Sequence, residues 1–96
     1  MTLDQLFSII CERRDNPTAQ SYTARLIAEG EDEIVKKVGE EAVEVILAAK
    51  AQGNQRLVEE LADLVYHSLV LLAAKDISLS AIHDELSNRH LYSTRR

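Results

Sequence analysis

Two acidic segments, EEAVE at residues 40–44 and ELAD at residues 60–63, decide the fold that we expect for this 96-residue chain. Side chains that lie three residues apart project from the same face of an α-helix. Glu41 and Glu44 therefore form one carboxylate pair, and Glu60 and Asp63 form another. The spacing predicts two helices, each with an acidic face.

Each acidic pair lies among residues that favour burial. On a helical wheel of about 100° per residue, Glu41 and Glu60 each share a face with a set of mostly apolar residues. These sets are Ile34, Lys37, Val45 and Ala48 around Glu41, and Leu57, Leu64, His67 and Leu71 around Glu60. The two acidic faces are therefore expected to meet inside a helical bundle.

Carboxylates that meet in this way repel one another, and raised pKa values or bound cations relieve the repulsion. A set of ligands made only of oxygen atoms favours Mg²⁺, Mn²⁺ or Ca²⁺. The pattern thus predicts a divalent metal site. The alternative is a solvated acidic surface, because a chain with ten glutamates forms such short strings by composition alone.

Helical periodicity and capping signals predict five helices. Thr2 and Gln5 have the spacing of a capping box, Ser21 can cap a short second helix, and Gly30 stops that helix. Asn54 is the expected cap of the fourth helix. The expected helices span about 2–14, 21–30, 32–51 and 54–75, with a last helix from about 78 and a polar tail over 88–96.

Composition points to one ordered, soluble, all-α domain over residues 1–96. Hydrophobic residues make up 46% of the chain and charged residues 28%, with three glycines and one proline. The net charge of −5 offers no field that attracts nucleic acid or an anionic membrane. The single cysteine, Cys11, and an N-terminus without a signal-peptide pattern fit a reducing cytoplasm.

The fourth predicted helix also suggests the oligomeric state. Its half from Leu61 to Ala74 is apolar almost all round, and a short chain has little material with which to cover it. We therefore expect a bundle that is completed by homodimerisation.

The motifs resemble those of the phosphoribosyl-ATP pyrophosphohydrolase family of histidine biosynthesis, within the all-α, MazG-type nucleoside triphosphate pyrophosphohydrolase superfamily. The superfamily signature is EExxE followed by ExxD. Segments similar to the family itself are Ser21-Tyr22-Thr23, residues 37–42 and residues 62–67. The resemblance implies metal-dependent hydrolysis of 1-(5-phosphoribosyl)-ATP to 1-(5-phosphoribosyl)-AMP and pyrophosphate, with Mg²⁺, or alternatively Mn²⁺, as the cofactor.

The resemblance also implies roles for individual residues. The expected metal ligands are Glu41, Glu44, Glu60 and Asp63, and the expected catalytic residues are Glu40, Glu41 and Glu44. Glu40 either orients water or faces solvent. The expected substrate-binding residues are Ser21, Tyr22, Arg25, Lys37, His67 and Arg89, although each also has a structural interpretation, such as a helix cap, a core histidine or a surface charge. We expect a stand-alone domain without the cyclohydrolase to which many relatives are fused.

Two other functions remain open from the sequence. A house-cleaning pyrophosphohydrolase that acts on free nucleoside triphosphates would keep the acids without needing the segment Ser21-Tyr22-Thr23. A non-enzymatic helical dimerisation module would show no dependence on magnesium.

Overall fold

A computed structural model of the chain describes residues 1–92, with side chains as far as Arg89. Five α-helices make up this part of the chain, which contains no strand. They are α1 (Leu3–Asp15), α2 (Tyr22–Glu29), α3 (Glu31–Ala51), α4 (Asn54–Ala74) and α5 (Leu79–Tyr92). The expectation of an all-α fold of about five helices is confirmed.

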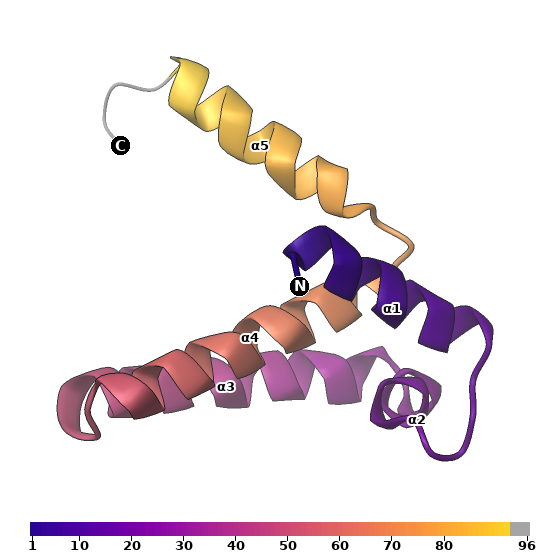
Figure 1. Cartoon of the computed structure of the whole chain (residues 1–96), viewed down its shortest axis with the longest axis horizontal. Coiled ribbons are helices and arrows are strands. Elements are labelled where there is room, and N and C mark those ends of the chain that lie inside the picture. Colours follow the sequence, from indigo (N-terminus) through magenta and orange to yellow (C-terminus); the bar gives the residue numbers. More distant parts are fainter. Residues whose placement is uncertain (93–96) are drawn as a thin grey trace.

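The two long helices α3 and α4 form an antiparallel hairpin, and α1 and α2 pack against the end opposite its turn (Figure 1). Apolar side chains of these four helices and of Leu79, the first residue of α5, meet there and form the core. Its buried members are Ile10, Leu26, Ile34, Leu69, Val70, Ala73 and Leu79. The core therefore lies beside the N-terminal half of α3 and the C-terminal half of α4.

The far half of the hairpin is covered by no other helix in residues 1–92 (Figure 1). Large apolar residues stay exposed along this part of α3 and α4. They are Val43, Ile46, Leu47, Val58 and Leu61. The apolar half of α4 that was expected to need cover is thus only partly buried within one chain, with Leu61 42% and Val65 37% exposed.

The caps of α1 and α2 follow the sequence prediction. Thr2 Oγ1 accepts a hydrogen bond from the Gln5 backbone N–H at 3.1 Å, and Gln5 Oε1 accepts one from the Thr2 N–H at 2.7 Å. Ser21 caps α2 through its hydroxyl. The prediction of Asn54 as a cap is wrong, because α4 begins at this residue and Gly53 is its N-cap. Gly53 has a φ of 88°, which a glycine adopts without strain.

Most helix ends lie within one residue of the expected positions, but the last one does not. We expected a polar tail from residue 88, whereas α5 continues to Tyr92. Arg89 and Glu85, one helical turn apart, form an ion pair with an N–O distance of 3.0 Å, and this pair stabilises the extended helix. Residues 93–96 of the expected tail lie outside the described part of the chain.

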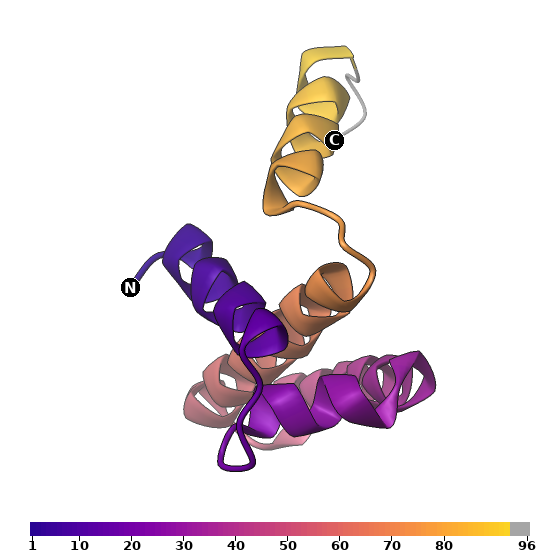
Figure 2. The same cartoon turned by 90° about the vertical axis from the view of Figure 1, so that its right-hand side faces the viewer.

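The turn after α4 sends α5 away from the hairpin (Figure 2). The backbone N–H of Ile77 donates to the carbonyl of Leu72 at 2.9 Å, and that of Asp76 to Ala73 at 3.1 Å. This is the Schellman arrangement, in which one residue adopts the left-handed conformation, here Asp76 with φ 55°. None of the helices in residues 1–92 is both long and apolar enough to cross a lipid bilayer.

Candidate functional site

The acidic faces of α3 and α4 meet in the hairpin. Glu41 on α3 and the pair Glu60 and Asp63 on α4 each offer one carboxylate oxygen, and these oxygens lie within 4.8 Å of one another. Glu60 is buried, with 6% of its surface exposed, whereas Glu41 is half-buried and Asp63 is exposed. We call these three residues the acidic cluster.

Repulsion within the acidic cluster is visible at Glu41. Burial raises the pKa of its carboxyl group, and the neighbouring carboxyl groups of Asp63 and Glu60 raise it further, while His67 opposes them. A raised pKa means that the folded protein disfavours the ionised form. A proton or a cation is therefore needed to stabilise these carboxylates together.

The donors of the acidic cluster fit a hard divalent cation. All three are carboxylates, and their charge and oxygen chemistry match Mg²⁺ or Mn²⁺ better than a softer metal that prefers imidazole or thiolate. The three carboxylates come from two helices, and Glu41 and Glu60 are 19 positions apart in the sequence. The fold is therefore what brings these ligands together. The structure thus provides a possible metal-binding cluster.

Glu44 and Glu40 lie outside the acidic cluster. Glu44 is half-buried and follows Glu41 by three residues on the same helix. Glu40 has a side chain that is 52% exposed, and its Oε1 lies 3.9 Å from Nζ of Lys37. Of the four expected ligands, the structure therefore brings together Glu41, Glu60 and Asp63, and the roles of Glu44 and Glu40 stay predictions.

His67 links the acidic cluster to α2. Its Nδ1 lies 2.9 Å from the backbone carbonyl of Asp63, and its Nε2 lies 3.0 Å from the hydroxyl of Tyr22. Because a carbonyl can only accept, Nδ1 carries a hydrogen and donates it to the Asp63 carbonyl, while Nε2 forms the hydrogen bond with the Tyr22 hydroxyl. Both ring nitrogens of this buried histidine are therefore used within the protein, and its contact with substrate stays a prediction.

Aromatic rings reinforce the link between α2 and α4. The ring centroids of Tyr66 and His67 lie 5.0 Å apart in an edge-on arrangement, and those of Tyr22 and Tyr66 lie 6.3 Å apart and stacked. The hydroxyl of Tyr66 also bonds to that of Thr23. The motif Ser21-Tyr22-Thr23 is thus held against α4, close to the acidic cluster.

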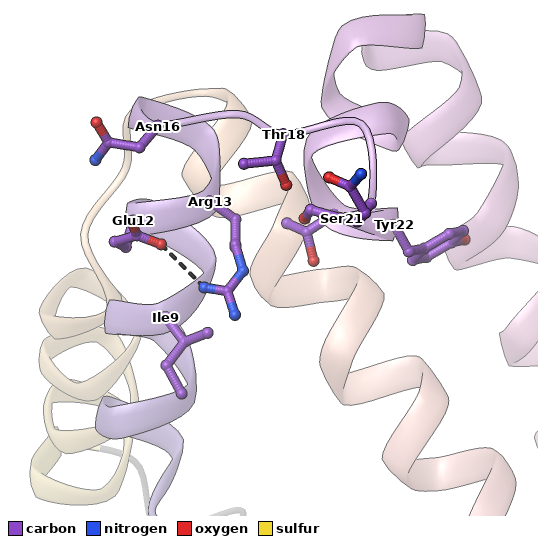
Figure 3. A pocket seen from close by; sticks show the side chains of 9 residues that line it. Ile9, Glu12, Arg13, Asn16, Thr18, Ser21 and Tyr22 are labelled. Atoms are coloured by element: carbon purple, nitrogen blue, oxygen red, sulfur yellow. Dashed lines mark hydrogen bonds and ion pairs between the residues drawn. The ribbon is translucent and has the colours of Figure 1, made fainter.

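A groove of about 490 Å³ lies on the other side of this motif, between α1 and the loop that leads to α2 (Figure 3). Its lining residues are Ile9, Glu12, Arg13, Asn16, Thr18, Gln20, Ser21, Tyr22 and Thr23. Arg13 and Glu12, which lie on the α1 side of the groove, form an ion pair at 3.0 Å. Tyr22 takes part in both regions, since it lines the groove and bonds to His67.

The expected basic substrate contacts lie in three different places. Lys37 is half-exposed on α3, one turn before Glu41, and its charge acts on Tyr22. Arg25 donates to the carbonyl of Ala19 at 2.9 Å and so holds the loop before α2. Arg89 lies on α5, which points away from the acidic cluster of the same chain (Figure 1). Of the three, Lys37 is the one that shares a helix with Glu41.

The sequence analysis missed one residue of this site. The guanidinium group of Arg56 forms ion pairs with both Glu59 and Glu60. The signal was present, because Arg56 precedes Glu60 by four residues, the spacing at which helical side chains meet.

An all-α chain whose helical hairpin brings together carboxylates of the EExxE and ExxD motifs belongs to the MazG-type class of nucleoside triphosphate pyrophosphohydrolases. Within this class the chain is a member of the phosphoribosyl-ATP pyrophosphohydrolase family, whose sequence description matches residues 3–90.

Curated relatives agree with this assignment. A phosphoribosyl-ATP pyrophosphatase of Bacillus cereus (strain AH187) is 51% identical over 85 residues, which cover 88% of this chain and 79% of the relative. One of Geotalea daltonii is 48% identical over 87 residues, covering 91% and 82%. The histidine biosynthesis bifunctional protein HisIE of Nostoc sp. is 44% identical over 88 residues, or 92% of this chain, which spans only 41% of that protein.

Proposed function

We propose that this chain hydrolyses 1-(5-phosphoribosyl)-ATP to 1-(5-phosphoribosyl)-AMP and pyrophosphate, an early step of histidine biosynthesis. The observation that carries this proposal is the convergence of Glu41, Glu60 and Asp63 within 4.8 Å in a member of the phosphoribosyl-ATP pyrophosphohydrolase family. The proposed cofactor is Mg²⁺, with Mn²⁺ as a substitute.

In this proposal the acidic cluster holds the cation, and Glu44 joins it as a fourth ligand from the same face of α3. A bound divalent cation supplies charge neutralisation at the phosphate oxygens and a lowered pKa of coordinated water. Glu41 and Glu44 act in catalysis by holding this centre. Glu40, which is exposed beside Lys37, orients the attacking water.

The substrate needs cationic and aromatic contacts besides the metal centre. Lys37 is the proposed phosphate contact, because it lies one turn before Glu41 and a lysine ammonium binds phosphate as a point charge. Tyr22, 42% exposed, offers a ring face beside the same region. Ser21, Arg25 and His67 are proposed to complete the substrate contacts around α2.

Arg89 requires a second subunit in this proposal. It lies on α5, a helix that runs away from the hairpin of its own chain (Figure 1), so in this proposal it reaches a substrate when α5 packs against the partner's hairpin. The exposed apolar residues on the far half of the hairpin give a homodimer a surface to bury. We propose such a homodimer, located in the cytoplasm.

A panel of nucleotides tests the reaction. Pyrophosphate release is measured with Mg²⁺ present, using 1-(5-phosphoribosyl)-ATP, ATP and the deoxynucleoside triphosphates at equal concentrations. We expect the highest kcat/KM for 1-(5-phosphoribosyl)-ATP. A preference for free nucleoside triphosphates would instead support a house-cleaning enzyme, and no release from any substrate would contradict the enzymatic function.

Light scattering tests the homodimer separately. We expect twice the chain mass of 10.8 kDa at micromolar concentration. Ile46→Asp, which places a charge on a residue that is 61% exposed, should yield the monomer without loss of the helical signal. A monomeric parent protein would contradict the proposed dimer.

A further inference from the structure

Glu60 is the most buried member of the acidic cluster, and its carboxylate forms an ion pair with the guanidinium group of Arg56. Its Oε1 accepts a hydrogen bond from Nη2 of Arg56, while Nη1 of the same guanidinium group donates to Oε1 of Glu59. Within residues 1–89, the ion pair between Arg56 and Glu60 is the one that involves a member of the acidic cluster. Glu41 and Asp63 form no ion pair in that part of the chain. Arg56 is thus the one direct charge partner of the cluster in that part of the chain.

The location of Arg56 is unfavourable for the helix itself. It is the third residue of α4, and the first turn of α4 contains no acidic residue. A cation in the first turn interacts unfavourably with the helix dipole, whereas α3 begins with acidic residues, as the dipole favours. The pairing with Glu59 and Glu60 offsets this cost, and a pairing with the exposed Glu59 alone contributes little to stability.

The guanidinium group fixes the rotamer of Glu60. A planar guanidinium presents its donors in a rigid fork, and here the fork spans two successive carboxylates. A carboxylate has two oxygens, so an arginine bonded to Oε1 can hold the group while the carboxylate still offers an oxygen to a cation. Groups that hold a metal ligand in this way typically change metal affinity by about 10-fold to 100-fold when they are removed.

We infer that Arg56 is a positioning residue of the metal centre, which holds Glu60 in the orientation that binds the cation. This inference rests on the proposed function, because it assumes that the acidic cluster binds Mg²⁺. It predicts that removing Arg56 weakens cation binding, whereas relief of simple charge repulsion would strengthen it. An arginine that acts only as a nearby positive charge weakens the binding of a dication, so its removal would strengthen binding.

Mn²⁺ binding, measured by electron paramagnetic resonance, distinguishes the two effects. We expect Arg56→Ala to raise the Kd for Mn²⁺ by about 10-fold to 100-fold. Arg56→Lys keeps the charge but loses the fork, and it should also raise the Kd, by a smaller factor. Tighter or unchanged binding in Arg56→Ala, or an unchanged Kd in Arg56→Lys, would overturn the inference.

Two further variants show whether the effect passes through Glu60. Glu59→Gln removes the outer partner of Arg56 but keeps its bond to Glu60, so its Kd should stay close to that of the parent. In a Glu60→Gln background, Arg56→Ala should change the Kd no further, and an additional loss there would contradict a role through Glu60.

Unfolding measurements in the absence of metal control for structural damage. Arg56→Lys retains the charge and a good helix former, so it remains informative if Arg56→Ala does not fold. A parent protein that binds no Mn²⁺ would contradict the metal centre and this inference together. A parent that binds Mn²⁺ with the same Kd as both Arg56 variants would overturn the inference alone.

Discussion

The hydroxyl of Tyr22 forms a hydrogen bond with Nε2 of His67 at 3.0 Å, and this contact joins α2 to the helix that carries two of the three clustered acids. His67 is 7% exposed, and its other ring nitrogen is bonded to the carbonyl of Asp63. The position of Tyr22 and the backbone at Asp63 are therefore coupled through one buried imidazole ring.

Tyr22→Phe should destabilise the protein by about 1–3 kcal/mol, because it leaves Nε2 of a buried histidine without a partner. The loss is measured by urea unfolding. In a His67→Phe background, the same substitution at Tyr22 should cost much less, since the partner is already absent. An equal loss in both backgrounds would show that the hydrogen bond contributes nothing.

Ile34→Ala should destabilise the protein by about 2–5 kcal/mol, because Ile34 is 0% exposed and its truncation leaves a cavity in the core. Its neighbour Val35 is 50% exposed and gives a matched control. Val35→Ala should change the free energy of unfolding by about 0.5 kcal/mol or less. Similar losses in the two variants would contradict the burial of α3 described above.

Glu41 should make the stability of the metal-free protein fall as the pH rises. Its pKa is raised in the folded state, so folding takes up protons in the pH range above the ordinary value of 4.5. Stability is therefore fully present below that pH and is lost as the pH rises through the raised pKa. Glu41→Gln should reduce this decline, as measured by thermal melts in EDTA. An identical pH profile in parent and variant would show that Glu41 does not titrate as described.

Lys37→Ala should lower kcat/KM by about 10-fold to 150-fold at saturating Mg²⁺, the loss expected for one charge-assisted hydrogen bond to phosphate. Lys36 is exposed and lies next to Lys37 in the chain, but on a different side of α3. Lys36→Ala should therefore retain activity within about twofold. Equal effects of the two substitutions would indicate only a general electrostatic contribution, and metal affinity must be measured in both.

The sequence allowed much of the fold to be predicted, since periodicity and caps are local properties. The capping box at Thr2 and Gln5 and the stop at Gly30 depend on neighbouring residues alone. The end of α5 depends on weak helix propensities, and there the prediction was wrong. The direction of α5 is set by the turn at Asp76, whose left-handed conformation no periodic pattern reveals.

The site was predicted less completely than the fold. Spacing placed Glu60 and Asp63 on one face of their helix, and the apolar neighbours of both acidic faces led to the prediction that Glu41 meets them. The bond between Tyr22 and His67 joins residues 45 positions apart, so it depends on how α2 packs on α4. Arg56 escaped notice because an arginine near a helix start is usually a surface charge.

Asp63→Asn is the sharpest test of whether the acidic cluster holds the catalytic metal. This substitution keeps the shape of the side chain and removes one ligand charge from an exposed position, so folding should be preserved. Pyrophosphate release from 1-(5-phosphoribosyl)-ATP is measured as a function of Mg²⁺ concentration, with helical content followed by circular dichroism and with Asp32→Asn, at another exposed position, as the control. We predict that Asp63→Asn abolishes release at all Mg²⁺ concentrations, while Asp32→Asn behaves as the parent. A folded Asp63→Asn variant with near-normal turnover would show that the acidic cluster does not hold the catalytic metal.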